Sequence, residues 1–269
     1  MSDDFFSKRE LEIINEFSSK GYITFPIKEL KYLEKIRSEV CRLICEFTKT
    51  KKKNELSEII NYLHKDVEVK DLNDLRIYIM DNLNNQQWFK LAHFYVAKEY
   101  LEILIGNELA MQRRINISIQ FPDDDSSLLP VHSDIWTGHS PFELVLWIPL
   151  VDAFKTKSLF ILPEKHYSEF EEQYKTLGKK SSEQVYSVIE KKVEFLNVPY
   201  GNAAIFSQHL PHGNRINKEN ETRLSFNCRF KGIFTPYAEK KFGEFYEPIT
   251  LRPTSELGLN YKLPTIDDD

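Results

Sequence analysis

The sequence predicts a mainly β fold with added α-helices, a double-stranded β-helix (jelly roll) with an N-terminal helical region packed outside it. Two observations indicate this architecture. Residues 1–106 repeat apolar side chains at helical spacing, whereas residues 107–248 hold many short apolar or alternating segments separated by turn residues. Short strands with turn signals between them are typical of a barrel or jelly roll.

The N-terminal part is expected to be mainly helical. Apolar side chains recur every three or four positions over residues 33–47 and 56–63, which is the period of an amphipathic helix. Residues 88–105 predict a further, largely buried helix, and Gly106 is placed to end it. The short run from Ile77 to Ile79 fits either a helix or a strand.

The strands of the core are predicted from two kinds of pattern. Some segments alternate apolar and polar residues with period two, and others are short, nearly continuous apolar runs typical of buried strands. The predicted strands cover residues 115–121, 143–150, 158–162, 193–197, 203–206 and 223–230. No repeat, linker or composition break divides the chain, so residues 1–269 are expected to form one domain, with residues 249–269 as a C-terminal tail.

The last predicted strand has two different faces. One face is apolar and the other polar, and in order along the strand they consist of Leu224, Phe226, Cys228 and Phe230, and of Arg223, Ser225, Asn227 and Arg229. The polar face either lies against water or lines the mouth of the barrel, where its groups converge on an anionic ligand. The alternation fits both interpretations.

Composition narrows the class of protein. A net charge of −5 gives no support to nucleic-acid binding, which usually requires a basic surface. Three cysteines argue against a disulfide framework, and no segment reaches membrane-spanning length. We therefore expect a cytoplasmic protein without nucleic-acid or membrane partners.

Four residues far apart in the sequence predict a metal site. His132 and Asp134 are two positions apart, so on an extended segment their side chains point the same way. His212 follows the predicted strand at 203–206, and Arg223 comes eleven residues later, on the next strand. Two histidines and one carboxylate leave open positions on iron that suit oxygen activation, and a buried arginine suits a carboxylate ligand.

Four stretches carry a family resemblance. They are RRINISIQFP at residues 113–122, HSDIWTGHSP at 132–141, HGNRIN at 212–217 and TRLSFNCRFK at 222–231. Together they resemble the phytanoyl-CoA-dioxygenase-like superfamily of 2-oxoglutarate oxygenases. Within it the chain is most similar to the branch encoded in bacterial surface-carbohydrate gene clusters, and the likeness covers roughly residues 111–248.

The resemblance implies cofactors and roles. His132, Asp134 and His212 would be the catalytic iron(II) ligands, Arg223 would pair with the distal carboxylate of the co-substrate 2-oxoglutarate, and Ser225 would add a hydroxyl donor. The implied reaction hydroxylates or otherwise oxidises a small molecule, expected to be a sugar, nucleotide sugar or glycan precursor of surface polysaccharide. Since related halogenases lack the carboxylate, Asp134 favours oxidation over halide transfer. A homo-oligomer is compatible with the sequence.

Two residues close to His212, Asn214 and His209, bear on its predicted role. Many superfamily members have serine where this chain has Asn214, which leaves the role of Asn214 in co-substrate binding open. His209 is the alternative distal ligand, but choosing it would leave the His-Gly-Asn motif unexplained. We therefore predict that His209 lies in the pocket or supports a ligand.

Two other classes of function compete with the oxygenase. One is a non-catalytic jelly-roll module that binds carbohydrate, and the other is a cupin-like metalloenzyme, such as an isomerase, that needs no 2-oxoglutarate. The three ligands and Arg223 speak against the first. The second stays open, and Arg223→Ala would separate it, because activity unaffected by that change would favour the isomerase.

Overall fold

Two antiparallel sheets form the core of the structure, a computed structural model that describes residues 3–50, 55–177 and 181–263. The last six residues of the predicted tail, 264–269, lie outside the described residues. The larger sheet has the order β1-β7-β4-β9-β2-β10, with β3 also paired to β9, and the smaller sheet has the order β6-β5-β8. The strands of the larger sheet are β1 (Tyr22–Pro26), β2 (Leu109–Gln112), β3 (Asn116–Gln120), β4 (Glu143–Pro149), β7 (Asn202–Ser207), β9 (Arg223–Gly232) and β10 (Tyr246–Pro248). The strands of the smaller sheet are β5 (Phe160–Ile161), β6 (Glu194–Phe195) and β8 (His212–Gly213).

Each strand of the larger sheet presents alternate residues to two different layers. In β4, Leu144 and Leu146 belong to the apolar cluster shared with the helices, whereas Val145 and Trp147 pack with Ile161 of the smaller sheet. This division follows from the period of two along a strand. The space between the sheets is therefore lined by the odd-numbered residues of β4 and β9.

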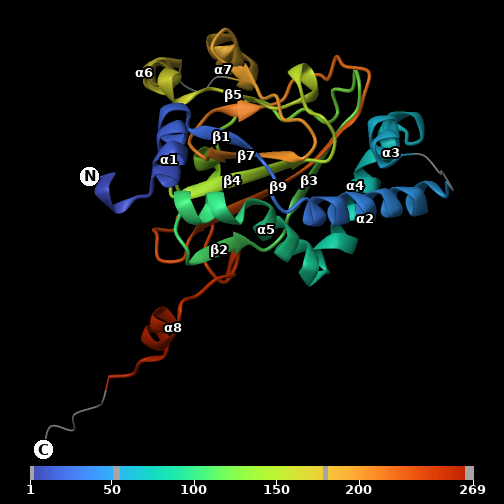
Figure 1. Cartoon of the computed structure of the whole chain (residues 1–269). Coiled ribbons are helices and arrows are strands. Elements are labelled where there is room, and N and C mark those ends of the chain that lie inside the picture. The colour runs from blue at the N-terminus through green and yellow to red at the C-terminus, as the bar shows by residue number, and fades with distance from the viewer. Residues whose placement is uncertain (1–2, 51–54, 178–180, 264–269) are drawn as a thin grey trace, which may run out of the picture.

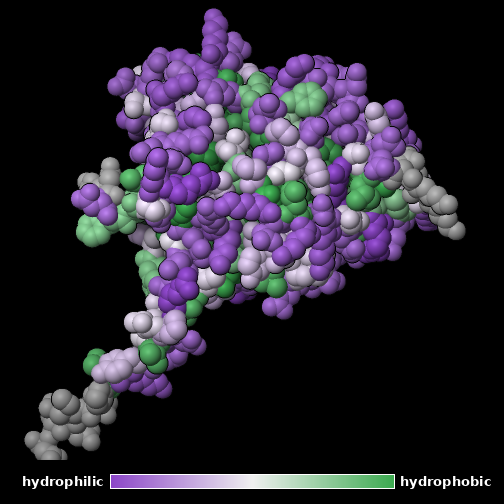
Figure 2. All heavy atoms as spheres, in the orientation of Figure 1, coloured by the Kyte–Doolittle hydropathy of each residue, from purple (hydrophilic) through white to green (hydrophobic). Residues whose placement is uncertain are grey.

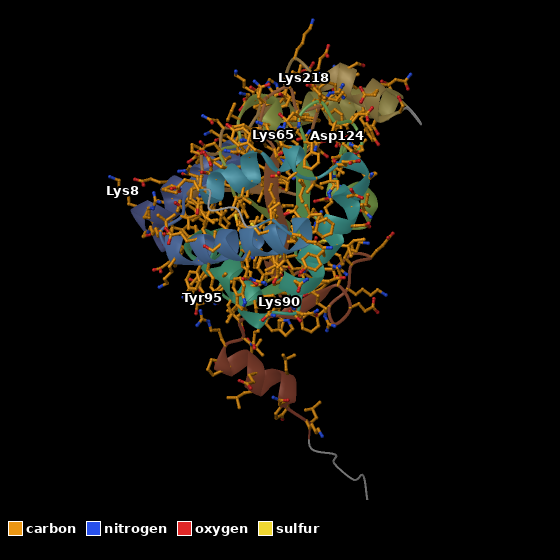
Figure 3. The ribbon with its side chains drawn as sticks, turned by 90° about the vertical axis from the view of Figure 1, so that its right-hand side faces the viewer. Lys8, Lys65, Lys90, Tyr95, Asp124 and Lys218 are labelled. Carbon is orange, nitrogen blue, oxygen red and sulfur yellow. The ribbon has the colours of Figure 1, made fainter. Side chains whose placement is uncertain are left out.

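Helices of the N-terminal part cover the outer face of the larger sheet, as predicted. The helices are α1 (Lys8–Lys20), α2 (Leu30–Thr48), α3 (Leu56–Asn61), α4 (Leu72–Asn84), α5 (Gln87–Leu104), α6 (Tyr167–Leu177), α7 (Ser182–Ile189) and α8 (Pro253–Asn260). Buried side chains of α2, α4 and α5 share one cluster with the even-numbered residues of β9. Figure 3 views the molecule from the side that these helices cover. The run from Ile77 to Ile79, whose sequence fitted either a helix or a strand, lies within helix α4.

Several elements were not predicted, among them the short strands β2, β8 and β10, the helix α8 in the predicted tail, and two larger features. Strand β1 lies in the N-terminal helical region and pairs with β7 at the edge of the larger sheet. Helices α6 and α7 are inserted between β5 and β6, and they lie together at the end of the molecule opposite α8 (Figure 1). The predicted strands at 158–162 and 193–197 are correspondingly short, because only two residues of each form ladder pairs.

The C-terminal helix α8 stands away from the domain (Figure 1) and has no buried residue. The face of the molecule drawn in Figure 2 is mostly hydrophilic, with separate hydrophobic spots. Within the described part of the chain, no helix is both long and apolar enough to cross a membrane.

Candidate metal centre

Three predicted ligands converge between the two sheets. One potential ligand atom from each of His132, Asp134 and His212 lies within 4.8 Å of the other two. The Nε2 atom of His132 is 3.8 Å from Oδ1 of Asp134, and the two imidazole rings are 4.3 Å apart at their centroids. The sequence-based choice of His132, Asp134 and His212 therefore corresponds to one cluster in space.

Backbone pairing brings the two histidines together. The His132 N–H donates to the carbonyl of His212 at 3.0 Å, and the His212 N–H donates back at 2.8 Å. This antiparallel bridge extends the smaller sheet beyond β8, which itself pairs with β5. In an antiparallel bridge, directly opposed side chains project to the same face, so both imidazoles point into one space.

Each histidine is oriented by a carbonyl group two residues earlier. Nδ1 of His132 lies 2.9 Å from the carbonyl oxygen of Pro130, and Nδ1 of His212 lies 2.9 Å from that of Leu210. A carbonyl only accepts hydrogen bonds, so Nδ1 must carry the proton and Nε2 presents a lone pair. This is the usual way in which a second partner prepares imidazole as a metal ligand.

Asp134 has one occupied and one free carboxylate oxygen. Arg229 donates from Nη2 to Oδ1 at 2.9 Å, whereas Oδ2 is buried without a partner in the described part of the chain. Burial acts to raise the pKa of this carboxyl group, but His212 and Arg229 outweigh it, and the pKa lies below its ordinary value. A buried, ionised carboxylate oxygen with no hydrogen-bond donor is suited to a cation.

The protonation state of His212 suits the same purpose. Burial, reinforced by the nearby His132, lowers the pKa of His212 to about 4. His212 is therefore neutral at physiological pH, and a neutral imidazole is the form that binds metal ions. The donor set fits a divalent ion of the 2-His-1-carboxylate type, with two nitrogen ligands and one oxygen ligand.

A cavity of about 70 Å³ adjoins the three ligands. Its walls are formed by Ser118, Leu129, His132, Asp134, Val145, Trp147, Leu159, Phe206, His212, Gly213, Asn214, Arg223, Asn227 and Arg229. Three of the four polar residues of β9, the last predicted strand, thus line an interior space. The polar face of β9 points into the barrel, which resolves the two interpretations that the sequence left open.

Arg223 is almost fully buried, with 2% of its surface exposed. Its Nη2 donates to Oγ of Ser118 at 2.7 Å, and its Nε has no partner in the described part of the chain. Burial, together with the nearby Arg76, lowers the pKa of Arg223 to about 10, so it remains protonated at neutral pH. A buried cation with an unused donor is a binding site for an anionic group.

Ser225 lies beside Arg223 in sequence but has a different setting. Its Oγ accepts a hydrogen bond from the Trp147 indole at 3.1 Å, and the residue is fully buried. Ser225 is not among the residues that line the cavity. It holds Trp147 in place, and the hydroxyl contact to a co-substrate stays a prediction.

His209 is engaged outside the cavity. Its Nε2 lies 2.5 Å from the Glu164 carboxylate, its Nδ1 lies 2.7 Å from the Ser207 hydroxyl, and its ring meets Tyr167 edge-on. It does not line the cavity, but its carbonyl oxygen accepts from the hydroxyl of Ser133, which lies between His132 and Asp134, at 3.0 Å, so of the two predicted placements the supporting one fits the geometry. The preference for His212 over His209 as the distal member of the cluster agrees with the geometry.

Asn214 and Gly213 fit the loop that precedes His132. Asn214 accepts from the Leu129 N–H at 2.6 Å and its own N–H donates to the Leu129 carbonyl at 2.9 Å. A Cβ atom on Gly213 would lie 2.7 Å from that same carbonyl oxygen. The His-Gly-Asn motif therefore clamps the loop whose Pro130 carbonyl orients His132.

Comparison with known proteins gave matches only among solved structures. No protein-family model matches the sequence, and no curated protein matches it. The fold is similar to that of ThoJ, a non-heme monooxygenase solved as a nickel complex, with a TM-score of 0.56 and 15% identity over 96% of this chain and 91% of that one. It is also similar to AviO1 from Streptomyces viridochromogenes Tue57, with a TM-score of 0.55 and 16% identity over 87% of this chain and 99% of AviO1.

A third similar structure contains the co-substrate expected here. HygX from Streptomyces hygroscopicus, solved with nickel and 2-oxoglutarate bound, gives a TM-score of 0.50 and 14% identity over 86% of this chain and 89% of HygX. At these identities the similarity establishes the fold. The chain has the fold of these proteins, a double-stranded β-helix, as the sequence predicted.

Proposed function

We propose that this protein is a 2-oxoglutarate-dependent oxygenase with Fe(II) held by His132, Asp134 and His212. The observation that carries the proposal is the placement of this triad and of a buried, partly unpaired Arg223 on the walls of one cavity. The bound nickel and 2-oxoglutarate of HygX support it, because that protein shares the fold.

The chain's own residues would have distinct tasks. The triad would hold the ion on one side and leave the cavity side open, while Arg223 would pair with the distal carboxylate of 2-oxoglutarate. When bound, the iron and the keto acid supply the oxidising chemistry, with decarboxylation to succinate and transfer of oxygen from O2. The apolar walls formed by Val145, Leu159 and Phe206 would exclude water from this reaction.

We further propose that the substrate is a sugar, nucleotide sugar or glycan precursor of bacterial surface polysaccharide. The sequence resemblance described above supports this class. Asn116 donates to the side chain of Asn227 at 3.3 Å, and Asn227 lines the cavity beside Arg229. Amide groups at the rim of a cavity are suited to hydroxyl-rich ligands. Three free cysteines are consistent with a cytoplasmic enzyme, which we also propose.

Turnover without the true substrate tests the reaction class. The reconstituted protein is incubated in air with Fe(II) and carboxyl-labelled 2-oxoglutarate, and released CO2 and succinate are measured. We expect slow release from the native protein, acceleration by the correct sugar or nucleotide sugar, and none from Asp134→Ala. If neither product forms with a panel of such sugars, while Fe(II) binds, a metalloenzyme that does not use 2-oxoglutarate is favoured. If no metal binds, a carbohydrate-binding module is favoured.

A further inference from the structure

Glu143 is a fully buried carboxylate at the start of β4. It does not line the cavity and is not one of the three clustered ligands. Its inward direction follows from the strand, because Val145 and Trp147 on the same face point between the sheets. Burying a carboxylate is costly unless its oxygen atoms are satisfied. The hydrogen-bond partners of Glu143 therefore indicate its role.

Four hydrogen-bond partners surround this carboxylate. Oε2 lies 2.8 Å from Nδ1 of His139, 2.7 Å from the Gln208 amide and 2.5 Å from the Tyr246 hydroxyl. Oε1 accepts from the backbone N–H of Ser140 at 3.1 Å. Lys231, also buried, is the register partner of Glu143 on β9 and supplies a nearby positive charge. Both oxygen atoms are thus engaged by segments from different parts of the chain.

One of these partners leads directly to Asp134. The backbone carbonyl of Gln208 accepts from the Asp134 N–H at 3.1 Å and from the Ser133 hydroxyl at 2.9 Å. The side chain of Gln208 is anchored on Glu143, and within the described residues its Oε1 has no partner. Glu143 therefore fixes the residue that holds the backbone of a metal ligand.

The other partners secure the far end of the same loop. His139 and Ser140 close the loop that begins at Asp134, and both are bonded to Glu143. The turn at residues 134–138 ends in Gly138, whose φ of 86° allows the chain to reverse there. One carboxylate thus secures both ends of the loop that carries Asp134.

We propose that Glu143 is a positioning residue that sets Asp134 for metal binding through Gln208 at one end of the loop and His139 and Ser140 at the other. The inference rests on the proposed metal centre but not on the identity of the substrate. Side chains that orient ligands typically change metal affinity by about 10- to 100-fold when they are removed. A purely structural role would lower stability and leave the affinity of the folded protein unchanged.

The test measures Ni(II) affinity by calorimetry, at a temperature where every variant is folded. Glu143→Gln keeps the shape but replaces one acceptor oxygen by an amide that must itself donate, so three donors lose their partner if the amide stands in place of Oε2, and one if it stands in place of Oε1. Gln208→Met keeps the backbone carbonyl and removes only the link to Glu143. We expect the Ni(II) dissociation constant to rise about 10- to 100-fold in Glu143→Gln and in the same direction in Gln208→Met.

Glu221→Gln is the matched control. Glu221 also faces a buried lysine, pairing with Lys157 at 2.5 Å, but neither residue lines the cavity. Its Ni(II) affinity should stay native even where its thermal stability falls. A native dissociation constant in Gln208→Met, or an equal loss in Glu221→Gln, overturns the positioning role. If Glu143→Gln does not fold, Gln208→Met decides alone. If the native protein itself binds no Ni(II), the proposed metal centre fails together with this inference.

Discussion

At the scale of single residues, the proposed metal centre depends on which atom of His132, Asp134 and His212 is left free. Carbonyl groups occupy Nδ1 of both histidines, and Arg229 occupies one oxygen of Asp134. One potential ligand atom of each residue lies within 4.8 Å of those of the other two. Sequence reasoning selected His132, Asp134 and His212 from their combination and the family resemblance, and these three side chains form one cluster in space. It did not identify the pairing of Arg229 with Asp134, because a period of two gives the face of a strand and not the partner across the barrel.

Gly213→Ala should damage the centre through the loop it contacts. A Cβ at this position would lie 2.7 Å from the Leu129 carbonyl and 3.0 Å from the Phe160 ring, so the loop before His132 must move. Overpacking of this kind costs about 1–3 kcal/mol. We expect a lower free energy of unfolding and a smaller stabilisation by Ni(II), measured by denaturant unfolding with and without the metal. Gly258→Ala, which has open space around its Cβ, should leave both quantities unchanged or slightly improved.

Arg229→Gln should weaken metal binding and make it more sensitive to acid. Without the guanidinium, burial acts on the Asp134 carboxyl with less opposition, so its pKa rises and protons compete with the metal at a higher pH. We expect the pH midpoint of Ni(II) binding to move upward and the affinity at pH 7 to fall roughly 10-fold or more. Titrations between pH 4 and 8 would show this. Identical midpoints in the variant and the native protein would contradict the role assigned to Arg229.

At the scale of elements, β9 joins the two halves of the site. Its even-numbered residues 224–230 pack on the helices, and three of its odd-numbered residues, Arg223, Asn227 and Arg229, line the cavity, so one strand contributes both to the core and to the site. The alternation in the sequence predicted this strand and its two faces. Which face meets water depends on the strands and loops opposite it, and the sequence alone does not specify them. Strand β1 was missed for a similar reason, because its five residues become a strand by pairing with β7, far along the chain.

Arg223→Met should separate co-substrate binding from metal binding. Charge-assisted hydrogen bonds contribute about 1.5–3 kcal/mol, so the dissociation constant of 2-oxoglutarate should rise roughly 10- to 100-fold. The Ni(II) affinity should not change, because Arg223 is not one of the three clustered ligands. Calorimetric titration of the Ni(II)-loaded protein with 2-oxoglutarate measures the effect. Arg215→Met, which removes a surface pair with Glu183, is the control. Equal affinities in Arg223→Met and Arg215→Met would contradict the assigned role.

At the scale of the whole molecule, the helices and the larger sheet share one apolar core, and a histidine is buried within it. His93 of α5 is fully buried, and its ring packs edge-on against the rings of Phe89 and Phe226. Burial lowers the pKa of His93 to about 4 from an ordinary value of 6.5. Between pH 6.5 and pH 4, His93 binds a proton in the unfolded chain but not in the folded chain. The free energy of unfolding therefore falls as the pH drops from 6.5 towards 4.

His93→Leu should remove part of this pH dependence. A shift from 6.5 to about 4 corresponds to about 3 kcal/mol of stability lost on acidification. We expect the metal-free variant to lose less of its free energy of unfolding between pH 7 and pH 4 than the native protein does. Denaturant unfolding at the two pH values measures the difference. A variant with the native pH dependence would show that His93 does not contribute.

In the proposed function, the ion and 2-oxoglutarate bind together at His132, Asp134, His212 and Arg223. The most direct test is an anaerobic titration of the Fe(II)-loaded protein with 2-oxoglutarate, followed by visible absorption. A chelate of the keto acid on Fe(II) gives a weak charge-transfer band. We predict this band in the native protein and in His209→Ala, and its absence in His212→Ala. No band in the native protein, or a band that survives His212→Ala, would contradict the account.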